Sequence, residues 1–384
     1  MNRTIDIAHV IFRLDVGGLE NGLTNLINRL DENTYRHSII SLEEPTSFSD
    51  RITSKNVKVY TINKKPGKDP HAYLRLYRLL RQIRPDVVHT RNIGTVDVSL
   101  AAALARVPHR IHGEHGWELT DLQGTRARYR TLRRVCQPFI ERFVCVSRHL
   151  EHWLEHSIGI PPKKIVHIAN GVDTLRFAPR SGNQRPVGRE SMPADAIVIG
   201  TVGRLIRLKN HRLLIEAFSS LLDKASPYTD LLRLTIVGDG PEHASLVAQA
   251  RELGLADRIW FAGRRDDVDE LMRSFDVFVL PSLQEGMSNT LLEAMSSGVA
   301  VIAADVGGNS ELVEDAVSGS LVPSQDKSAL VERLEKYVAD PLLRKSHGAA
   351  ARARVEKQFS LTSMADAYSH LYRRIAGAAN ATRS

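Results

Sequence analysis

The sequence predicts an α/β protein made of two doubly wound, Rossmann-like domains that face each other across a cleft. Apolar, β-branched runs alternate with helical patterns from end to end, and one stretch rich in Pro, Gly and charged residues interrupts the alternation. The 384 residues are also enough for more than one core. Because strands separated by helical segments form parallel sheets with right-handed crossovers, two such sheets are expected.

The first half contains seven apolar runs that fit strands, at residues 5–13, 37–42, 57–62, 86–90, 109–112, 142–146 and 164–168. Helical patterns fit between these runs. One of them places its apolar residues on a single face at helical spacing (Leu19, Leu23, Leu26, Ile27 and Leu30). The first domain is therefore predicted over residues 1–180.

Residues 177–195 show no sustained period and are interpreted as the linker. Five further strands are expected after it, at residues 196–203, 232–240, 258–263, 276–282 and 299–305. Helical segments near 326–339 and 341–358 close the second half, and a last helix begins at Leu361. The second domain is therefore predicted over residues 181–360, and residues 361–384 form a separate C-terminal segment.

The composition excludes several classes of protein. Hydrophobic residues make up 42% of the chain and charged residues 25%, which excludes a disordered, collagen-like or disulfide-framework protein. No run approaches the 18 apolar residues of a membrane-spanning helix. The start carries Asp6 and no long apolar core, so no secretory signal is expected. Cys136 and Cys145 are interpreted as reduced, which predicts a cytoplasmic location.

The net charge of +8 is unevenly distributed. Residues 1–180 hold 28 Lys and Arg against 18 Asp and Glu, whereas residues 181–384 hold 24 against 26. Two segments concentrate the excess (Arg75, Arg78, Arg81 and Arg84; Arg126, Arg128, Arg130, Arg133 and Arg134). They predict either a solvated helix face or a surface for anionic lipid head groups or an anionic acceptor. No nucleic-acid motif accompanies the charge, so nucleic acid is not an expected partner.

Gly17 and Gly18 follow the first predicted strand and open a helix. Two glycines let the backbone approach a ligand, and the N–H groups at a helix start favour an anion. A tight turn is the alternative interpretation. The pair is not the G-x-G-x-x-G fingerprint, which argues against a nicotinamide dinucleotide.

Arg204 and Lys209 follow Gly203, at the end of the first strand of the second half. They leave a strand end and approach a helix start together, and two cations at a helix start can hold a diphosphate without a metal. The alternative is that they are exposed basic residues in a loop.

Glu285 and Glu293 lie eight residues apart across a glycine-bearing loop. Thr290 and Glu293 have the spacing of a capping box in which Thr290 is the N-cap. Glu285 precedes the helix and has no such explanation, so it is either an acid that acts on a ligand or a solvated loop residue.

His112 and His115 flank Glu114 after a predicted strand. Two histidines and a glutamate suggest zinc, but their spacing differs from the helical H-E-x-x-H and no third ligand is evident. Hydrogen bonding or proton handling suits a histidine at a strand end in the cleft better.

Taken in order, these motifs resemble those of the retaining GT4 glycosyltransferases, which have the two-domain GT-B fold. The resemblance runs from about residue 8 to residue 360 and includes two further segments, 170–173 (NGVD) and 238–241 (GDGP). More narrowly, the segments GGLENGLTNLINRL, HGEHGW and EGMSNTLLEAM are similar to those of sugar transferases from bacterial exopolysaccharide clusters.

The resemblance implies roles in the second domain. Arg204 and Lys209 match the pair that grips the donor's diphosphate, beside Gly203. Glu285 matches the acid near the donor sugar. Glu293 matches the residue that binds the donor ribose hydroxyls, and this role does not exclude helix capping. The backbone beside Glu285 also belongs to the implied donor site (Gly286, Met287 and Ser288). Many relatives have an aromatic residue after the Glu-Gly pair, so the departure here leaves the sugar undefined.

In the first domain, Gly17 and Gly18 match the loop that approaches the phosphates and the acceptor. His115 matches the histidine that contacts the transferred sugar, although His112 is also followed by glycine. The resemblance further implies that the first domain binds the acceptor and that residues 361–376 pack back across it.

The implied reaction is retaining transfer from a nucleotide-diphosphate sugar to a glycan or a lipid-diphosphate-linked acceptor in extracellular polysaccharide biosynthesis. No metal or other cofactor is implied, because the cations offset the charge of the leaving group. The basic first half suits an acceptor at the inner face of a membrane, with peripheral contact to anionic lipid. Two alternatives stay open: a nucleotide-sugar epimerase of the same fold, and a non-catalytic sugar-nucleotide-binding partner of a polysaccharide complex.

Overall fold

The computed structural model describes residues 3–15, 17–67, 69–118, 120–180, 187–189, 192–224 and 227–381. The chain divides into two compact units, one formed by residues 1–171 with 361–384 and the other by residues 172–360. The first boundary lies after Gly171, nine residues before the position expected from the sequence. Of the expected linker, residues 181–186 and 190–191 lie outside the described residues.

The first unit contains a seven-stranded parallel sheet with the strand order β3-β2-β1-β4-β5-β6-β7. Its strands are β1 (Ile5–Ile11), β2 (Tyr35–Ser41), β3 (Val57–Thr61), β4 (Val87–Arg91), β5 (His109–Glu114), β6 (Arg142–Cys145) and β7 (Ile165–His167). All seven predicted strands are confirmed, with ends that differ from the prediction by two residues or fewer. The order reverses between β1 and β4, and open α/β sheets bind ligands at such a point.

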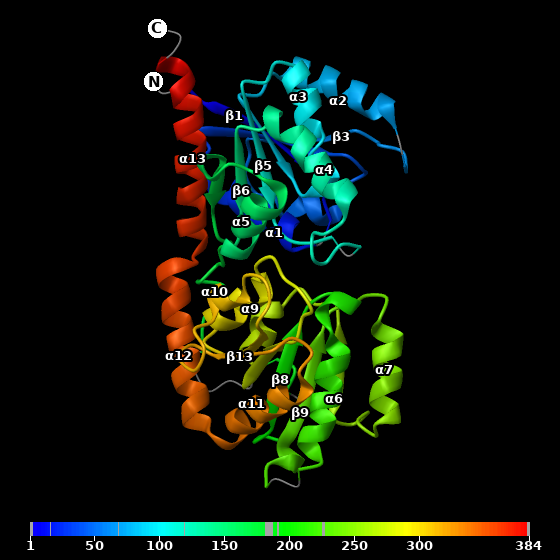
Figure 1. Cartoon of the computed structure of the whole chain (residues 1–384). Helices are drawn as coiled ribbons and strands as arrows, with labels where there is room; N and C mark the ends of the chain where they lie inside the picture. Colours follow the sequence, from blue (N-terminus) through cyan, green and yellow to red (C-terminus); the bar gives the residue numbers. More distant parts are fainter. Residues whose placement is uncertain are drawn as a thin grey trace. The chain divides into compact units, whose positions relative to one another are not determined.

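The helices of the first unit are α1 (Gly18–Arg29), α2 (Pro70–Ile83), α3 (Val98–Leu104), α4 (Ala127–Cys136), α5 (Arg148–Trp153) and α13 (Leu361–Ala381). Figure 1 shows the last of these, α13, running along the sheet of this unit. Its apolar face packs on the sheet in one buried cluster, in which Leu371 and Tyr372 lie with Ile7 and Val87. The C-terminal helix therefore completes the core of the first unit.

The second unit contains a six-stranded parallel sheet with the order β10-β9-β8-β11-β12-β13. Its strands are β8 (Ile197–Val202), β9 (Leu232–Val237), β10 (Ile259–Gly263), β11 (Val277–Leu280), β12 (Ala300–Ala304) and β13 (Ser320–Val322). The first five were predicted and β13 was not. Both sheets have the order of a doubly wound fold, so the predicted fold class is confirmed.

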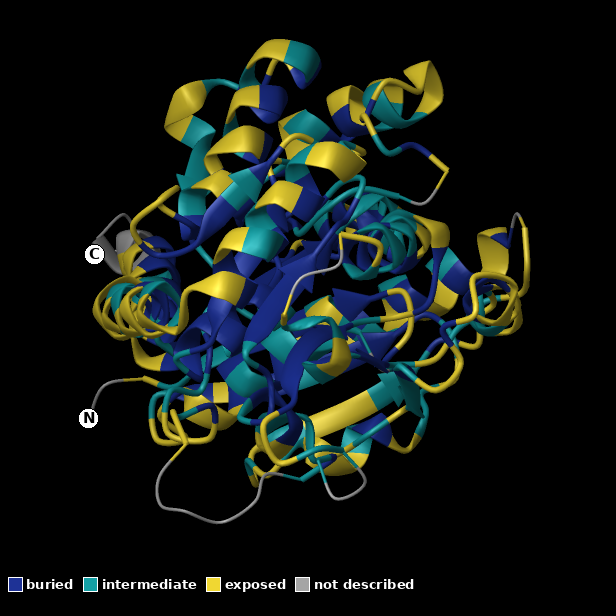
Figure 2. Ribbon diagram, turned by 90° about the horizontal axis from the view of Figure 1, so that it is seen from below, coloured by how far each residue is buried: buried dark blue, intermediate teal, exposed yellow. Residues whose placement is uncertain are grey.

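The helices of the second unit are α6 (His211–Leu222), α7 (His243–Glu252), α8 (Val268–Met272), α9 (Asn289–Ser296), α10 (Asn309–Leu312), α11 (Lys327–Ala339) and α12 (Pro341–Gln358). Figure 2 shows buried strands in dark blue and helices whose outer faces carry the exposed residues. Within the described ranges, no helix combines the length and the apolar character needed to cross a bilayer.

Candidate functional site

In the second unit, the predicted donor-site residues other than Glu293, which is in α9, lie on the loops that follow β8 and β11, the two strands between which the order reverses. The loop after β8 is held by the loop after β9. Leu205 N–H donates to the carbonyl of Asp239 at 2.9 Å. A Cβ on Gly238 would lie 1.9 Å from the carbonyl oxygen of Gly203, so only glycine permits this contact. The backbone around Gly203 is therefore fixed before any ligand binds.

Lys209 and Glu285 form an ion pair across the two loops. Lys209 Nζ lies 2.6 Å from Glu285 Oε1, and the same oxygen accepts a hydrogen bond of 2.7 Å from Ser282 Oγ. The Glu285 residue is only 9% exposed. Lys209 ends a short 3₁₀ helix that leads into α6. The structure thus brings together a predicted phosphate-binding cation and a predicted sugar-binding acid, and it pairs them.

Arg204 is exposed, and no side-chain hydrogen bond or ion pair involves it in the part of the chain that the structure describes. It follows β8 and Gly203 directly. A guanidinium that is accessible in this way can form a bidentate contact with a phosphate.

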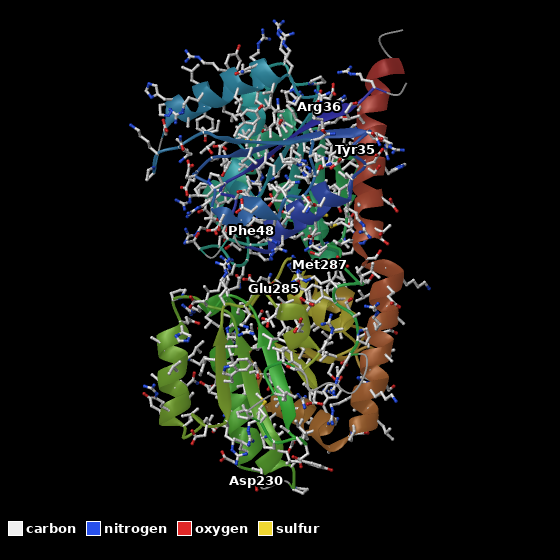
Figure 3. All side chains as sticks on the ribbon, turned by 180° about the vertical axis from the view of Figure 1, so that it is seen from behind. Tyr35, Arg36, Phe48, Asp230, Glu285 and Met287 are labelled. Carbon is white, nitrogen blue, oxygen red and sulfur yellow. The ribbon has the colours of Figure 1, made fainter. Side chains whose placement is uncertain are left out.

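The segment Glu285–Ser288 packs against a second glycine pair. A Cβ on Gly307 would lie 1.8 Å from the carbonyl oxygen of Glu285, and Gly308 N–H donates to the carbonyl of Gly286 at 3.0 Å. Figure 3 places the labelled Glu285 and Met287 at one end of the second unit and Asp230 at the other. Since Asp230 precedes β9 and Glu285 follows β11, the candidate site lies at the carboxyl ends of the parallel strands.

The predicted capping box is wrong. Helix α9 begins at Asn289, and its N-cap is Ser288, whose Oγ accepts from Leu291 N–H at 3.3 Å. Thr290 lies inside the first turn, and its Oγ1 lies 3.2 Å from Ser288 Oγ. Glu293 is therefore in the body of the helix, where it cannot reach the N-cap. It is partly exposed, so capping no longer explains its presence there.

In the first unit, Gly17 is the N-cap of α1, and Gly18 is the first residue of that helix. The Gly17 backbone is extended, and Glu20 folds back over it, since a Cβ on Gly17 would lie 2.2 Å from Glu20 Oε2. The carboxylate of Glu20 thus lies at the N-terminus of α1, where the helix dipole stabilises a negative charge.

His112 is a structural residue. Its Nδ1 lies 2.8 Å from Thr90 Oγ1, its Nε2 lies 3.1 Å from Glu114 Oε1, and the side chain is fully buried. Arg133 donates to both oxygens of Glu114, at 2.6 and 3.0 Å. Burial opposes the ionisation of Glu114, but Arg133 outweighs it and lowers the pKa of that carboxyl. Both ring nitrogens of His112 are occupied, so the geometry favours His115 as the histidine that meets a ligand.

His115 follows β5, and its backbone N–H donates to Asn92 Oδ1 at 2.8 Å. Burial, followed by the neighbouring Arg91, lowers the pKa of the His115 ring to about 3, so the ring is neutral at physiological pH. Arg91, which is not among the site residues predicted from the sequence, is 3% exposed and ends β4 beside this histidine. Its position at a strand end was the signal that could have found it.

The two arginine-rich segments differ. On α2, Arg78 and Arg81 are exposed, as a basic helix face predicts, and Arg84, the C-cap residue that follows the helix, is exposed as well. On α4, by contrast, Arg133 is buried, which contradicts its place on a solvent-facing basic surface. Arg134 donates to the carbonyls of Ser157 and Ile158 and so caps the end of another helical turn. The second segment is therefore partly structural.

Two family models match the chain. The model described as "Glycosyltransferase Family 4" matches residues 16–176, and the model described as "Glycosyl transferases group 1" matches residues 188–354. The chain is a glycosyltransferase. The two matches fall on the first and the second unit, respectively, as the resemblance to the GT4 glycosyltransferases predicted.

The glycosyltransferase is 26% identical to EpsF of Bacillus subtilis (strain 168), over 78% of this chain and 79% of that protein. It is 29% identical to the UDP-Gal:alpha-D-GlcNAc-diphosphoundecaprenol alpha-1,3-galactosyltransferase of Escherichia coli, over 79% of each chain. Its fold is similar to that of Anabaena Alr3699/HepE in a complex with UDP, with a TM-score of 0.80, 20% identity and coverage of 96% of this chain and 99% of that chain. The GT-B fold is thereby confirmed.

Proposed function

We propose that this glycosyltransferase moves a sugar from a nucleotide-diphosphate sugar to a glycan or lipid-diphosphate-linked acceptor in extracellular polysaccharide biosynthesis, with retention of the anomeric configuration. The observation that carries the proposal is the cluster of Arg204, Lys209 and Glu285 at the carboxyl edge of the second sheet. It combines two cations for a diphosphate with an acid for a sugar hydroxyl.

The chemistry follows from these charges. When the glycosidic bond to the diphosphate breaks, negative charge develops on the leaving phosphate, and the guanidinium of Arg204 and the ammonium of Lys209 stabilise it. The leaving phosphate then takes the acceptor proton on the same face of the sugar. Glu285 and His115 orient the sugar, and Glu293 binds the ribose hydroxyls. Because fixed cations supply the positive charge, the reaction requires no metal.

The names of similar proteins support a nucleotide-sugar donor. HepE has been crystallised with UDP and with UDP-glucose, and the name of the Escherichia coli relative specifies UDP-Gal and a diphosphoundecaprenol acceptor. Lipopolysaccharide core biosynthesis enzymes are also among the relatives.

Donor binding is tested by thermal shift with UDP-, GDP- and ADP-sugars in the presence of a metal chelator. We expect one nucleotide class to stabilise the protein and Lys209→Ala and Glu293→Ala to abolish the shift. Lys224→Ala is the matched control, because Lys224 forms a 2.7 Å ion pair with Glu335 on the surface of the same unit. If no donor stabilises the wild-type protein, or if the control loses the shift equally, the proposed donor site is wrong.

The reaction itself is tested by product analysis. We expect a glycosylated acceptor whose anomeric configuration, measured by NMR, equals that of the donor. Release of an epimerised sugar nucleotide without transfer would favour the epimerase alternative. Donor binding without turnover on any lipid-linked or glycan acceptor would favour the non-catalytic alternative.

We also propose that α2 makes peripheral contact with anionic lipid at the inner face of the cytoplasmic membrane, where a lipid-linked acceptor would be found. The helix presents Arg78 and Arg81 to solvent, together with Leu74, which is 44% exposed, and its C-cap residue Arg84 is exposed as well. Exposed arginines beside an apolar side chain suit a head-group surface, and each cation near such a surface contributes about 1 kcal/mol.

Sedimentation with vesicles that contain anionic lipid tests this contact. We expect binding at low salt, loss of binding at high salt, and several-fold weaker binding by the double variant Arg78→Gln/Arg81→Gln. The control is Arg251→Gln/Arg333→Gln on the second unit. Equal binding by both double variants would exclude α2 as the contact surface.

A further inference from the structure

Ser282 is a fully buried residue whose side chain bonds to Glu285, and none of the roles above uses it. It lies two residues after β11, and its Oγ is 2.7 Å from Glu285 Oε1. Within the described residues, this is the only hydrogen bond of the Ser282 hydroxyl. An ionised carboxylate only accepts hydrogen bonds, so Ser282 is the donor.

The two oxygens of the Glu285 carboxylate have different surroundings. Oε1 accepts from Ser282 and also from Lys209, whose Nζ lies 2.6 Å away. Oε2 accepts no hydrogen bond from any described residue, yet it is not a buried unpaired atom. It is therefore the oxygen that reaches solvent, although the side chain is only 10% exposed. Figure 3 shows Glu285 at the end of the second unit that carries the candidate site.

Ser282 and Lys209 restrain the Glu285 side chain in different ways. The Lys209 ammonium is at the end of a flexible four-carbon stem, and an incoming diphosphate competes for it. The Ser282 hydroxyl is on a single-carbon side chain with no exposed surface, so a ligand cannot draw it away. When Lys209 turns to a phosphate, the bond from Ser282 is therefore the one that remains on Oε1.

We propose that Ser282 is a positioning residue that keeps Glu285 Oε2 directed at a hydroxyl of the donor sugar while Lys209 binds the diphosphate. Ser282 acts through Glu285, since its burial prevents contact with a substrate. With Oε1 held by Ser282, Oε2 keeps its lone pairs to accept from the sugar hydroxyl. The identity of the ligand rests on the proposed function, whereas the anchoring of Glu285 is a property of the unliganded protein.

Crystal structures of Lys209→Met and Lys209→Met/Ser282→Ala without ligand test the anchoring. Lys209→Met imitates the state in which the ammonium has left the carboxylate. We expect Glu285 to keep its side-chain conformation and its bond to Ser282 in the single variant, and to lose that conformation in the double variant. Movement of Glu285 in the single variant, or an unchanged Glu285 in the double variant, would overturn the proposal whether or not transferase activity is detected.

The consequence for transfer is tested with Ser282→Ala. We expect kcat to fall about tenfold, because a loosely held Glu285 no longer orients the sugar, while the Kd for a nucleoside diphosphate changes by about twofold or less. The Kd is measured by calorimetric titration with UDP, GDP and ADP. Ser282→Thr keeps the hydroxyl and should recover most of the lost kcat. A folded Ser282→Ala variant with the wild-type kcat would show that Ser282 does not position Glu285.

Ser274→Ala is the matched control. Ser274 is 3% exposed and its hydroxyl donates to the carbonyl of Leu271 at 2.6 Å. It precedes β11, so the control removes a buried hydroxyl at the opposite end of the same strand. We expect Ser274→Ala to keep the wild-type kcat, and an equal loss in both alanine variants would refute a specific role of Ser282. If none of the three nucleotides binds the wild-type protein, the proposed function fails, and the crystal structures alone decide on the anchoring.

Discussion

Lys209 and Glu285 neutralise each other at 2.6 Å, so an incoming diphosphate meets an ammonium group that already has a counter-ion. The arrangement holds both side chains in place, and it also makes Glu285 a competitor of the phosphate. The motif spacing predicted both residues, but no spacing could show that they are bonded to each other. Because of this pairing, a substitution of Glu285 is expected to affect the affinity for a nucleoside diphosphate and the turnover number in opposite directions.

We predict that Glu285→Gln binds a nucleoside diphosphate several-fold more tightly than the wild-type protein, because Lys209 loses its competing carboxylate. The same variant is expected to lower kcat at least tenfold, since the acid that orients the sugar is gone. Isothermal titration calorimetry and initial rates measure the two effects. Glu335→Gln, which removes the partner of Lys224, should change neither. Weaker nucleotide binding by Glu285→Gln would contradict this account.

The buried pair of Arg133 and Glu114 gives a second prediction for single residues. Arg133→Met leaves a fully buried carboxylate without its bidentate partner, which costs about 3–5 kcal/mol of unfolding free energy. Arg126→Met, at an exposed position of the same segment, should change stability by about 0.5 kcal/mol or less. Urea denaturation measures both. A loss of less than about 1 kcal/mol for Arg133→Met would show that the pair is not maintained in solution.

At the scale of elements, hydrophobic periodicity located the strands well because buried parallel strands are continuous apolar runs. It missed β13, whose three residues lie between Gly319 and Pro323 and are too few for a pattern. The capping-box motif, in turn, placed the start of α9 too late, because Ser288 and Thr290 are both good N-cap residues and only the backbone decides between them. The periodicity of the α13 residues predicts an apolar face, but it does not indicate which surface of the protein this face covers.

The packing of α13 predicts a sharp contrast between neighbours on one helix. Leu371 is 5% exposed and lies in the core of the first unit, whereas His370 is exposed. We expect Leu371→Ala to destabilise the first unit by about 2–5 kcal/mol and His370→Ala to be nearly neutral. Hydrogen exchange measured by mass spectrometry should place the loss of protection in strands β1 and β4. Loss confined to α13 would mean that the helix is not part of the cooperative core.

For the whole molecule, the arrangement of buried histidines predicts which unit is more sensitive to acid. In the first unit, burial lowers the pKa of His37 from 6.5 to about 4 and that of His115 to about 3, with Arg91 adding to both shifts. The pKa values of His9 and His89 are lowered as well, also by burial and Arg91. The second unit has one histidine with a comparable shift among its described residues, His211.

The sign of the effect follows from linkage. Below pH 6.5 these histidines are protonated in the unfolded chain but stay neutral in the folded protein. Their contribution to the free energy of unfolding is therefore fully present above pH 6.5 and decreases as the pH falls toward the pKa values of the folded protein. Each such histidine contributes about 1.4 kcal/mol per pH unit in this window. We therefore predict that, between pH 7 and about pH 5, hydrogen exchange corrected for intrinsic rates shows the first unit losing protection before the second. Equal loss in both units, or earlier loss in the second, would show that these rings are protonated in the folded state.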